Sequence, residues 1–307
     1  MAMLNPPESL PHLAGAMVNY LLRHGEQTEE DLGAVFAPTG LSVTKISNTL
    51  QVGLSVGLFT RDASSRFAAS EKLTKRHDSV PLPSRVVREV TRELILDHAR
   101  DGDPWQTRGG DRTSGGRDIA RALSWFLAQD AAGCPLSWTG RECGNVQHLQ
   151  SRQLQSVPEE DRVKNDTRWG AFTRWAPFLG LARWADTFPG GNGLLPIPLM
   201  AIREVASEMP VGVTHPINDL LQHLALRLPV LERGLYRRTL DSLLQEQPDP
   251  AVRDGQVGSP IAQSLLILEA KRFLKLEREP DVERVLLQQE ENVREVSHVV
   301  LLVEAGS

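Results

Sequence analysis

The sequence predicts a mainly α-helical protein with short β wings, in which winged helix-turn-helix domains at both ends are joined by a helical middle domain. Residues 42–67 read as a helix followed by a short hairpin, the final third of the chain repeats that order of elements, and the segment between them places tryptophan and arginine at helical spacing. We therefore expect an N-terminal winged helix, a Trp/Arg-rich helical middle domain and a C-terminal winged-helix-like domain, at residues 1–80, 81–216 and 217–307.

The N-terminal segment contains the three helices and the hairpin that a winged helix needs. Apolar residues at three- and four-residue steps predict helices at residues 10–24, 28–36 and 42–57. Thr28 and Asp31 resemble a capping box, Ser42 stands where an N-cap belongs, and Gly57 can supply a left-handed C-terminal turn. Two short strands around a polar tip are then expected, at residues 58–60 and 66–68.

A proline-punctuated lead-in, residues 4–11, precedes the first helix. Paired prolines favour an extended backbone. We expect either a plain extended arm or an arm that packs across the first domain or a neighbour.

The polar face of the third helix and the wing carry side chains suited to DNA. Short polar groups and cations there can bond phosphates or base edges. The candidate DNA-binding residues are Thr44, Lys45, Asn48, Gln51, Arg61 and Arg66. Residues 1–80 carry seven Lys/Arg against eight Asp/Glu, so this positive charge is local. The alternative is a solvated polar face on a module that serves dimerisation or protein docking.

The middle segment combines a long loop with an aromatic centre. Amphipathic helices are expected at residues 84–100 and 119–129, and the glycine-rich residues 101–118 between them predict a mobile loop or one that contacts DNA or a partner. Arginine and tryptophan alternate over residues 165–184, which fits either stacking on unpaired bases or a helical core with arginine stems over aromatic rings. Pro177 is expected to kink or end a helix there.

The final third predicts a second module of the same plan. Ser259 is expected to cap its third helix, with Pro260 at the first helical position. The three helices are expected at residues 217–231, 235–245 and 259–273. Two strands around Pro280 and Asp281 would form the wing, and one more would complete the sheet, at residues 274–277, 283–287 and 296–303.

This second module is acidic, with eleven Lys/Arg against fifteen Asp/Glu from residue 217 onward. A wing that carries a run of carboxylates would repel a phosphate backbone. We therefore assign partner binding to Glu277, Glu279, Asp281 and Glu283. The module is interpreted as a protein-binding winged helix, as a dimerising one that would make a homodimer, or as a DNA mimic that faces a basic partner.

The sequence contains no recognisable catalytic motif. No Ser-His-Asp, Cys-His or paired-carboxylate arrangement can be defended, and the phosphate-binding and zinc-protease motifs are missing. Cys134, Cys143 and His148 lack the spacing and the fourth ligand of a zinc site, and two cysteines do not make a disulfide scaffold. We expect no enzymatic activity, no cofactor and no metal.

The composition is that of an ordinary soluble globular protein, with 40% hydrophobic and 24% charged residues and a net charge of −5. No apolar run is long enough for a transmembrane helix, so no membrane contact is expected. The N-terminus lacks the basic and apolar regions of a signal peptide. A cytoplasmic location is the resulting expectation.

The opening LNPPESLP, the winged helix directly after it and the Trp/Arg-rich middle together resemble the DpdG family. Proteins of this family are encoded in bacterial clusters that insert 7-deazaguanine derivatives into DNA and restrict unmodified phage DNA. The resemblance implies an accessory component of an anti-phage defence system that works beside helicases and a nuclease-like protein. It supplies no catalytic residues.

Three functional hypotheses follow. The leading one is a non-catalytic subunit that binds double-stranded DNA through the first module and docks on defence partners, such as helicase or nuclease subunits, through the remainder. The first alternative is a pure protein–protein adaptor without DNA contact. The second is a winged-helix transcriptional regulator of the same locus.

Overall fold

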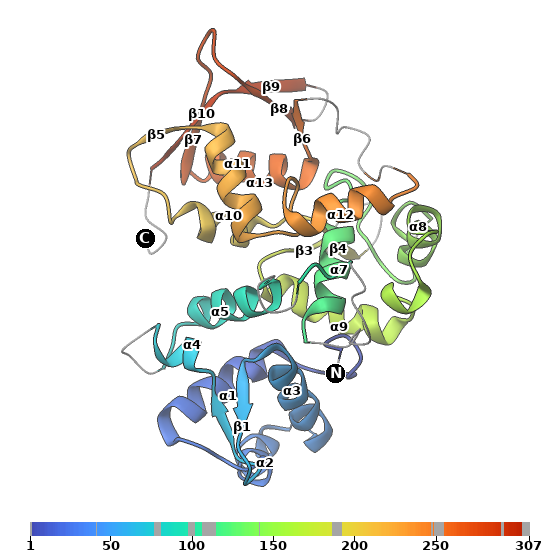
Figure 1. Cartoon of the computed structure of the whole chain (residues 1–307), viewed down its shortest axis with the longest axis vertical. Helices are drawn as coiled ribbons and strands as arrows, with labels where there is room; N and C mark the ends of the chain where they lie inside the picture. The colour runs from blue at the N-terminus through green and yellow to red at the C-terminus, as the bar shows by residue number, and fades with distance from the viewer. Residues whose placement is uncertain are drawn as a thin grey trace. The chain divides into compact units, whose positions relative to one another are not determined.

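A computed structural model of the 307-residue chain describes residues 2–40, 42–76, 81–97, 102–105, 115–140, 142–185, 192–246, 248, 255–289 and 292–302 (Figure 1). Helices predominate and the strands form small sheets, which confirms the mainly α class with short β elements. The chain forms two compact units: unit 1 comprises Met1–Ala120 and Val163–Leu179, and unit 2 comprises Arg121–Arg162 and Gly180–Ser307. These units do not follow the three segments predicted from the sequence, because the chain returns to unit 1 after residue 162.

Unit 1 begins with three helices followed by a hairpin. The helices are α1 (Pro11–His24), α2 (Glu29–Phe36) and α3 (Val43–Val56), with the short η1 (Ala37–Thr39) between the last two. The hairpin strands β1 (Phe59–Arg61) and β2 (Phe67–Ala69) are antiparallel, and β2 is also bridged to Gln27. The order of elements is the predicted one.

The ends of these helices show the local signals that the sequence contains. The Thr28 side chain accepts a hydrogen bond from the Asp31 N–H, and the Asp31 carboxylate accepts one from the Thr28 N–H in return. Ser42 caps α3 by accepting from the Lys45 N–H, and Gly57 ends it with a φ of 80°, which a residue without a Cβ adopts freely. Short-range hydrogen bonds therefore set the bounds of α2 and α3.

The lead-in packs across unit 1 instead of extending away from it. Met3 and Leu4 are fully buried, and their N–H groups donate to the carboxylate of Asp118 at 3.0 and 2.7 Å. The Leu10 N–H donates to Thr49 Oγ1 on α3 at 3.0 Å. Of the two expectations for this segment, the packed arm is the one observed.

The remainder of unit 1 consists of α4 (Glu71–Thr74), α5 (Ser84–Leu96), α9 (Asp166–Phe178) and the first residues of α7 (Arg117–Phe126). Both α5 and α9 pack against α1. Trp169 and Trp175 on α9 are buried, so this part of the Arg/Trp segment is helical core. Pro177 is the penultimate residue of α9, in agreement with a helix that ends there.

Unit 2 continues from α7 through helical and hairpin elements. They are η2 (Glu142–Gly144), α8 (Val146–Gln153), η3 (Glu159–Asp161), the antiparallel pair β3 (Arg183–Ala185) and β4 (Gly193–Leu195), and α10 (Leu199–Ala206). Cys134 and Cys143 form a disulfide, which the sequence analysis did not predict. The cysteine count argued against a scaffold of several bridges, and this single bridge only closes a local loop that the Ser137 N–H also ties to the Gly144 carbonyl.

Two small sheets and three helices form the C-terminal part of unit 2. The helices are α11 (Ile217–Arg227), α12 (Leu235–Leu243) and α13 (Ser259–Ala270). The strands are β5 (Thr214–Pro216), β6 (Gln256–Val257), β7 (Leu274–Glu277), β8 (Val285–Gln289), β9 (Asn292–Val296) and β10 (His298–Leu301). One sheet has the order β5-β10-β7 and the other the order β6-β8-β9, in which β6 and β8 are parallel. Figure 1 shows these strands on one side of α11 and α13.

The predicted C-terminal wing is not formed by the described strands. β7 pairs with β10, and β8 pairs with β9, so the segment between β7 and β8 crosses from one sheet to the other instead of closing a hairpin. The final strand expected at residues 296–303 corresponds to β10, whereas β9 was not predicted from the sequence. The sequence analysis paired the strands on either side of Pro280 and Asp281, whereas β8 pairs with the next strand, β9, and β7 pairs with the more distant β10.

Two further predictions need comment. Gly258 is the N-cap of α13, and Ser259, which was expected there, is already helical; its Oγ instead accepts a hydrogen bond from the Ala131 N–H at 2.7 Å. Of the predicted loop at residues 101–118, residues 101 and 106–114 lie outside the described residues, and its last two residues open α7.

Candidate nucleic-acid interface and docking surface

The tip of the β1–β2 hairpin carries the two arginines predicted to contact DNA. Arg61 and Arg66 are exposed, and the register places Arg61 opposite Phe67. The Arg61 guanidinium lies 5.3 Å from the centroid of the Phe67 ring, and Arg66 Nη2 donates to the Glu26 carbonyl at 3.0 Å. The structure therefore brings both cations to one short hairpin and orients each through a neighbour, while their side chains stay accessible.

The polar face of α3 is less accessible than the hairpin. Of the four candidate residues on this face, Thr44 is exposed. The other three are half-buried: Lys45, Asn48 and Gln51. The lead-in accounts for part of this burial, because Asn48 Nδ2 donates to the Pro7 carbonyl at 2.5 Å. The Lys45 ammonium lies 4.0 Å from the carboxylate of Glu8.

Sequence reasoning missed that the lead-in and α9 belong to this surface. Arg174 Nε on α9 donates to the Ser9 carbonyl at 3.1 Å, and Trp175 Nε1 donates to Ser9 Oγ at 3.0 Å. Burial lowers the pKa of Arg174, and the negative charge of Glu8 opposes that shift. The paired prolines were the only local signal of a fixed lead-in, and they could not indicate which helices it meets.

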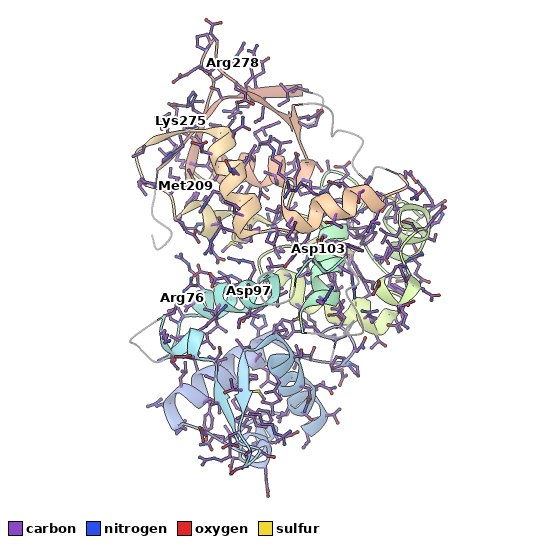
Figure 2. The ribbon with its side chains drawn as sticks, in the orientation of Figure 1. Arg76, Asp97, Asp103, Met209, Lys275 and Arg278 are labelled. Carbon is purple, nitrogen blue, oxygen red and sulfur yellow. A yellow bond between two sulfur atoms is a disulfide. The ribbon has the colours of Figure 1, made fainter. Side chains whose placement is uncertain are left out.

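The cations that follow the hairpin have acidic partners. Lys72 pairs with Asp97 at 3.3 Å, and Arg76, two residues after α4, pairs with Glu93 at 2.9 Å. Figure 2 labels Arg76 and Asp97. Exposed pairs of this kind contribute about 0–1 kcal/mol each, since water screens them. They reduce the net positive potential of unit 1, but a phosphate could replace the carboxylate at small cost.

The acidic segment predicted to bind partners lies between β7 and β8. Glu277 is half-buried, and the three other candidates are exposed: Glu279, Asp281 and Glu283. The Glu277 carboxylate lies 2.7 Å from the Lys275 ammonium, and the Glu279 N–H donates to Ser297 Oγ at 2.8 Å. Because this segment crosses between two sheets, its carboxylates are not presented on a wing as expected.

Arginines alternate with these carboxylates and also have partners. Arg278 and Arg284 both pair with Glu295 of β9, at 2.9 and 3.1 Å. Figure 2 shows Lys275 and Arg278 along this part of the chain. The surface is therefore of mixed charge, with Glu279, Asp281 and Glu283 as its exposed acidic groups.

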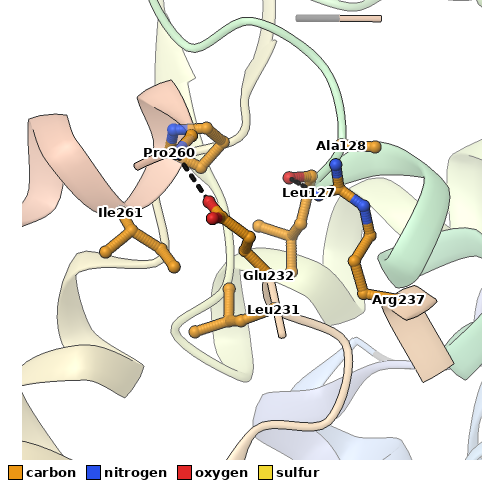
Figure 3. A pocket seen from close by; sticks show the side chains of 8 residues that line it. Leu127, Ala128, Leu231, Glu232, Arg237, Pro260 and Ile261 are labelled. Carbon is orange, nitrogen blue, oxygen red and sulfur yellow. Dashed lines mark hydrogen bonds between the residues drawn. The ribbon is translucent and has the colours of Figure 1, made fainter. Parts of the chain in front are cut away.

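A cavity of about 10 Å³ lies beside Glu232, with room for about one water molecule. The Glu232 carboxylate accepts a hydrogen bond from the Gly258 N–H at 2.6 Å, and Arg237 Nη1 donates to the Leu127 carbonyl at 3.3 Å (Figure 3). Burial raises the pKa of Glu232, although the Gly258 hydrogen bond and the charge of Arg237 oppose it. The volume is too small for a substrate, so we interpret this cavity as part of the packing of unit 2.

Trp184 on β3 has 50% of its surface exposed, whereas Trp169 and Trp175 are in the core. Within the described residues, no group of three or more His, Cys, Asp or Glu side chains is placed to hold a metal ion. The same residues contain no helix with the length and apolar character needed to cross a bilayer.

Comparison with known proteins gives one result. A family model described as DpdG-like matches residues 1–282, which is most of the chain. The searches of curated proteins and of solved structures returned no significant match. The matched range includes the lead-in, the hairpin and most of the segment between β7 and β8, and the chain belongs to the DpdG-like family.

Proposed function

We propose that this chain is a non-catalytic subunit of an anti-phage DNA modification-restriction system, which contacts double-stranded DNA through the β1–β2 hairpin and docks on other proteins of the system. Membership of the DpdG-like family points to the Dpd modification system and to association with its other proteins. The observation that carries the DNA contact is the hairpin itself. It follows three helices in the order of a winged helix and presents Arg61 and Arg66 at an exposed tip.

Two features of the hairpin suit a phosphate backbone. Arginine donates hydrogen bonds in a planar fork that matches phosphate oxygens. Arg61 is supported by a ring and Arg66 by a backbone carbonyl, so less side-chain freedom is lost when they bind. The half-buried Lys45 and Asn48 contribute less to this proposed contact, because the lead-in already bonds them.

The proposal of a non-catalytic role is supported by what the buried carboxylates do. Asp118 accepts the N–H groups of the lead-in, and Glu232 accepts the N–H that precedes α13. Glu269 is bonded by Arg294 of β9. Each of these carboxylates therefore accepts hydrogen bonds that organise the fold.

The proposed DNA contact is tested by fluorescence anisotropy with duplex and single-stranded probes across a salt series. Each phosphate contact contributes about 0.9 to the log–log salt slope on duplex DNA, so Arg61→Glu with Arg66→Glu is expected to reduce the slope by about 2 and weaken binding at low salt. Arg238→Glu with Lys271→Glu is the matched control, since it reverses two exposed cations on unit 2. Equal losses in both double variants would contradict a hairpin contact and indicate a net-charge effect.

A pure adaptor is the second candidate. It is favoured by the ion pairs that Lys72, Arg76 and Arg66 make with acidic neighbours, which lower the potential that would attract DNA. For an adaptor, anisotropy would stay flat at micromolar protein for every probe. Co-purification with helicase or nuclease subunits of the same cluster would then be the positive observation.

A further inference from the structure

The lead-in places a carboxylate beside cations from two helices of unit 1. Glu8 lies 4.0 Å from the Lys45 ammonium, and its charge also acts on Arg174. Lys45 is in the first turn of α3 and Arg174 is on α9, so Glu8 faces cations from two helices. The Glu8 side chain is 57% exposed and that of Lys45 34% exposed, so the pair is accessible to solvent.

The backbone around Glu8 is held firmly although its side chain is exposed. The Pro7 carbonyl accepts from Asn48, and the Ser9 carbonyl accepts from Arg174. Met3 and Leu4, a few residues earlier, are anchored on Asp118. Glu8 itself has a φ of 59°, a conformation that disfavours residues with a Cβ. The backbone that carries Glu8 is thus kept in a fixed place next to Lys45.

We propose that Lys45 and Arg174 form a second phosphate-binding position for duplex DNA, and that the Glu8 carboxylate occupies this position until a backbone phosphate displaces it. This inference rests on the proposed DNA contact and adds a site that includes α9. An exposed ion pair is worth little, so a backbone phosphate, which carries one negative charge like the carboxylate, can replace the carboxylate beside Lys45. The displaced Glu8 side chain needs only to rotate into water, while the anchored backbone of the lead-in stays in place.

Glu8 also weakens DNA binding, because its negative charge remains near the bound phosphate. Two like charges at short range repel each other, and solvent and salt screen that repulsion. Removal of the carboxylate is therefore expected to strengthen DNA binding most at low salt. This gain in DNA affinity depends on Lys45, because the Lys45 ammonium is the group that the phosphate binds.

The test is the DNA affinity of Glu8→Gln, measured by anisotropy at several salt concentrations. Glutamine has the size of glutamate and the same disfavoured φ, so the fold and the backbone strain are retained. We expect Kd to fall about three- to tenfold at low salt, because the repulsion between the carboxylate and the bound phosphate is removed, and the salt slope to become steeper, because salt screens that repulsion in the wild type. In the Lys45→Gln background, Glu8→Gln is expected to change Kd by less than about twofold.

Glu246→Gln is the matched control, because it removes one exposed carboxylate and frees Arg152 on unit 2. If Glu8→Gln and Glu246→Gln tighten binding equally, or if Glu8→Gln changes nothing while the wild type binds, the inference is overturned and the hairpin contact stands. If Glu8→Gln binds DNA and the wild type does not, the inference is supported, and the Glu8 carboxylate prevents measurable binding by the wild type. If the wild type and all variants fail to bind, both the inference and the proposed DNA contact are wrong.

Discussion

Buried charged residues in this protein link segments that are far apart in sequence. The carboxylate of Asp118 receives the N–H groups of Met3 and Leu4 and lies 3.4 Å from the guanidinium of Arg168. A buried carboxylate without such partners would cost several kcal/mol. The lead-in therefore has a fixed course in unit 1, and this course places Glu8 beside Lys45.

Glu269 plays a similar part at the edge of a sheet. Its carboxylate accepts from the Leu276 N–H at 2.9 Å, and Arg294, which is bonded to the same carboxylate, donates to the Leu276 carbonyl at 2.9 Å. These bonds satisfy backbone groups of β7, an edge strand in the order β5-β10-β7. Occupied edge groups do not pair with another chain, so this arrangement protects unit 2 from edge-to-edge association at β7.

Glu232 leads to a prediction about stability and pH. Burial raises its pKa above the ordinary value of 4.5, so the folded state favours the protonated form. That contribution to stability is present below the unfolded pKa and is lost as the pH rises through the folded pKa. Glu232→Gln stays neutral and keeps an oxygen that can accept the Gly258 N–H.

We expect the free energy of unfolding of Glu232→Gln, relative to that of the wild type, to increase between about pH 4 and pH 7. Urea unfolding at both pH values measures this difference. A difference that is independent of pH, or that favours the wild type at the higher pH, would contradict the assignment.

At the scale of elements, α3 and β1 are fitted to each other through a glycine. A Cβ placed on Gly53 would lie 2.3 Å from two ring carbons of Phe59, which is 2% exposed. The Leu58 N–H also donates to the Gly53 carbonyl at 2.8 Å. The absence of a side chain at position 53 therefore allows the hairpin to pack close to α3.

Two glycine substitutions in neighbouring helices are expected to have opposite effects. Gly53→Ala forces Phe59 or α3 to move and should lower the free energy of unfolding by about 1–3 kcal/mol. Gly33→Ala in α2 meets no atom within 4 Å and should raise it by about 0.5–1 kcal/mol through helix propensity. Urea titrations measure the free energy of unfolding of both variants. If both substitutions destabilise the protein, crowding at Phe59 is not the cause of the loss in Gly53→Ala.

At the scale of the whole molecule, unit 1 depends on segments that lie outside the first 80 residues. Asp118 anchors Met3 and Leu4, and α9 supplies the donors to Ser9. α1 packs against α5 as well as α9. The predicted domain at residues 1–80 includes neither Asp118 nor these two helices.

We therefore expect a fragment of residues 1–80 to unfold with low cooperativity and to bind a hydrophobic dye, because it lacks the partners of the lead-in and of α1. Urea unfolding followed by circular dichroism, compared with the full-length chain, measures the cooperativity. A sharp transition with dispersed amide resonances would show instead that residues 1–80 fold by themselves.

Particular residues show why some elements could be predicted and others could not. Ser42, Thr28 and Gly57 act within a few residues of themselves, so the bounds of α2 and α3 follow from local sequence. Arg61 and Arg66 were likewise found because a hairpin brings its own tip to the surface. Glu8 and Arg174 were missed because more than 160 residues of sequence separate the lead-in from α9, as the bond from Arg174 to Ser9 shows.

The sequence by itself determined the helical class, the N-terminal order of helices and hairpin, and the position of Arg61 and Arg66 on that hairpin. These properties depend on propensity, periodicity and capping, which act over a few residues. Only the tertiary structure decided that β7 pairs with the distant β10, that the acidic segment is therefore a crossover, and that the lead-in covers part of α3. Those outcomes depend on which distant groups satisfy each other's hydrogen bonds and charges, and local sequence patterns do not contain that information.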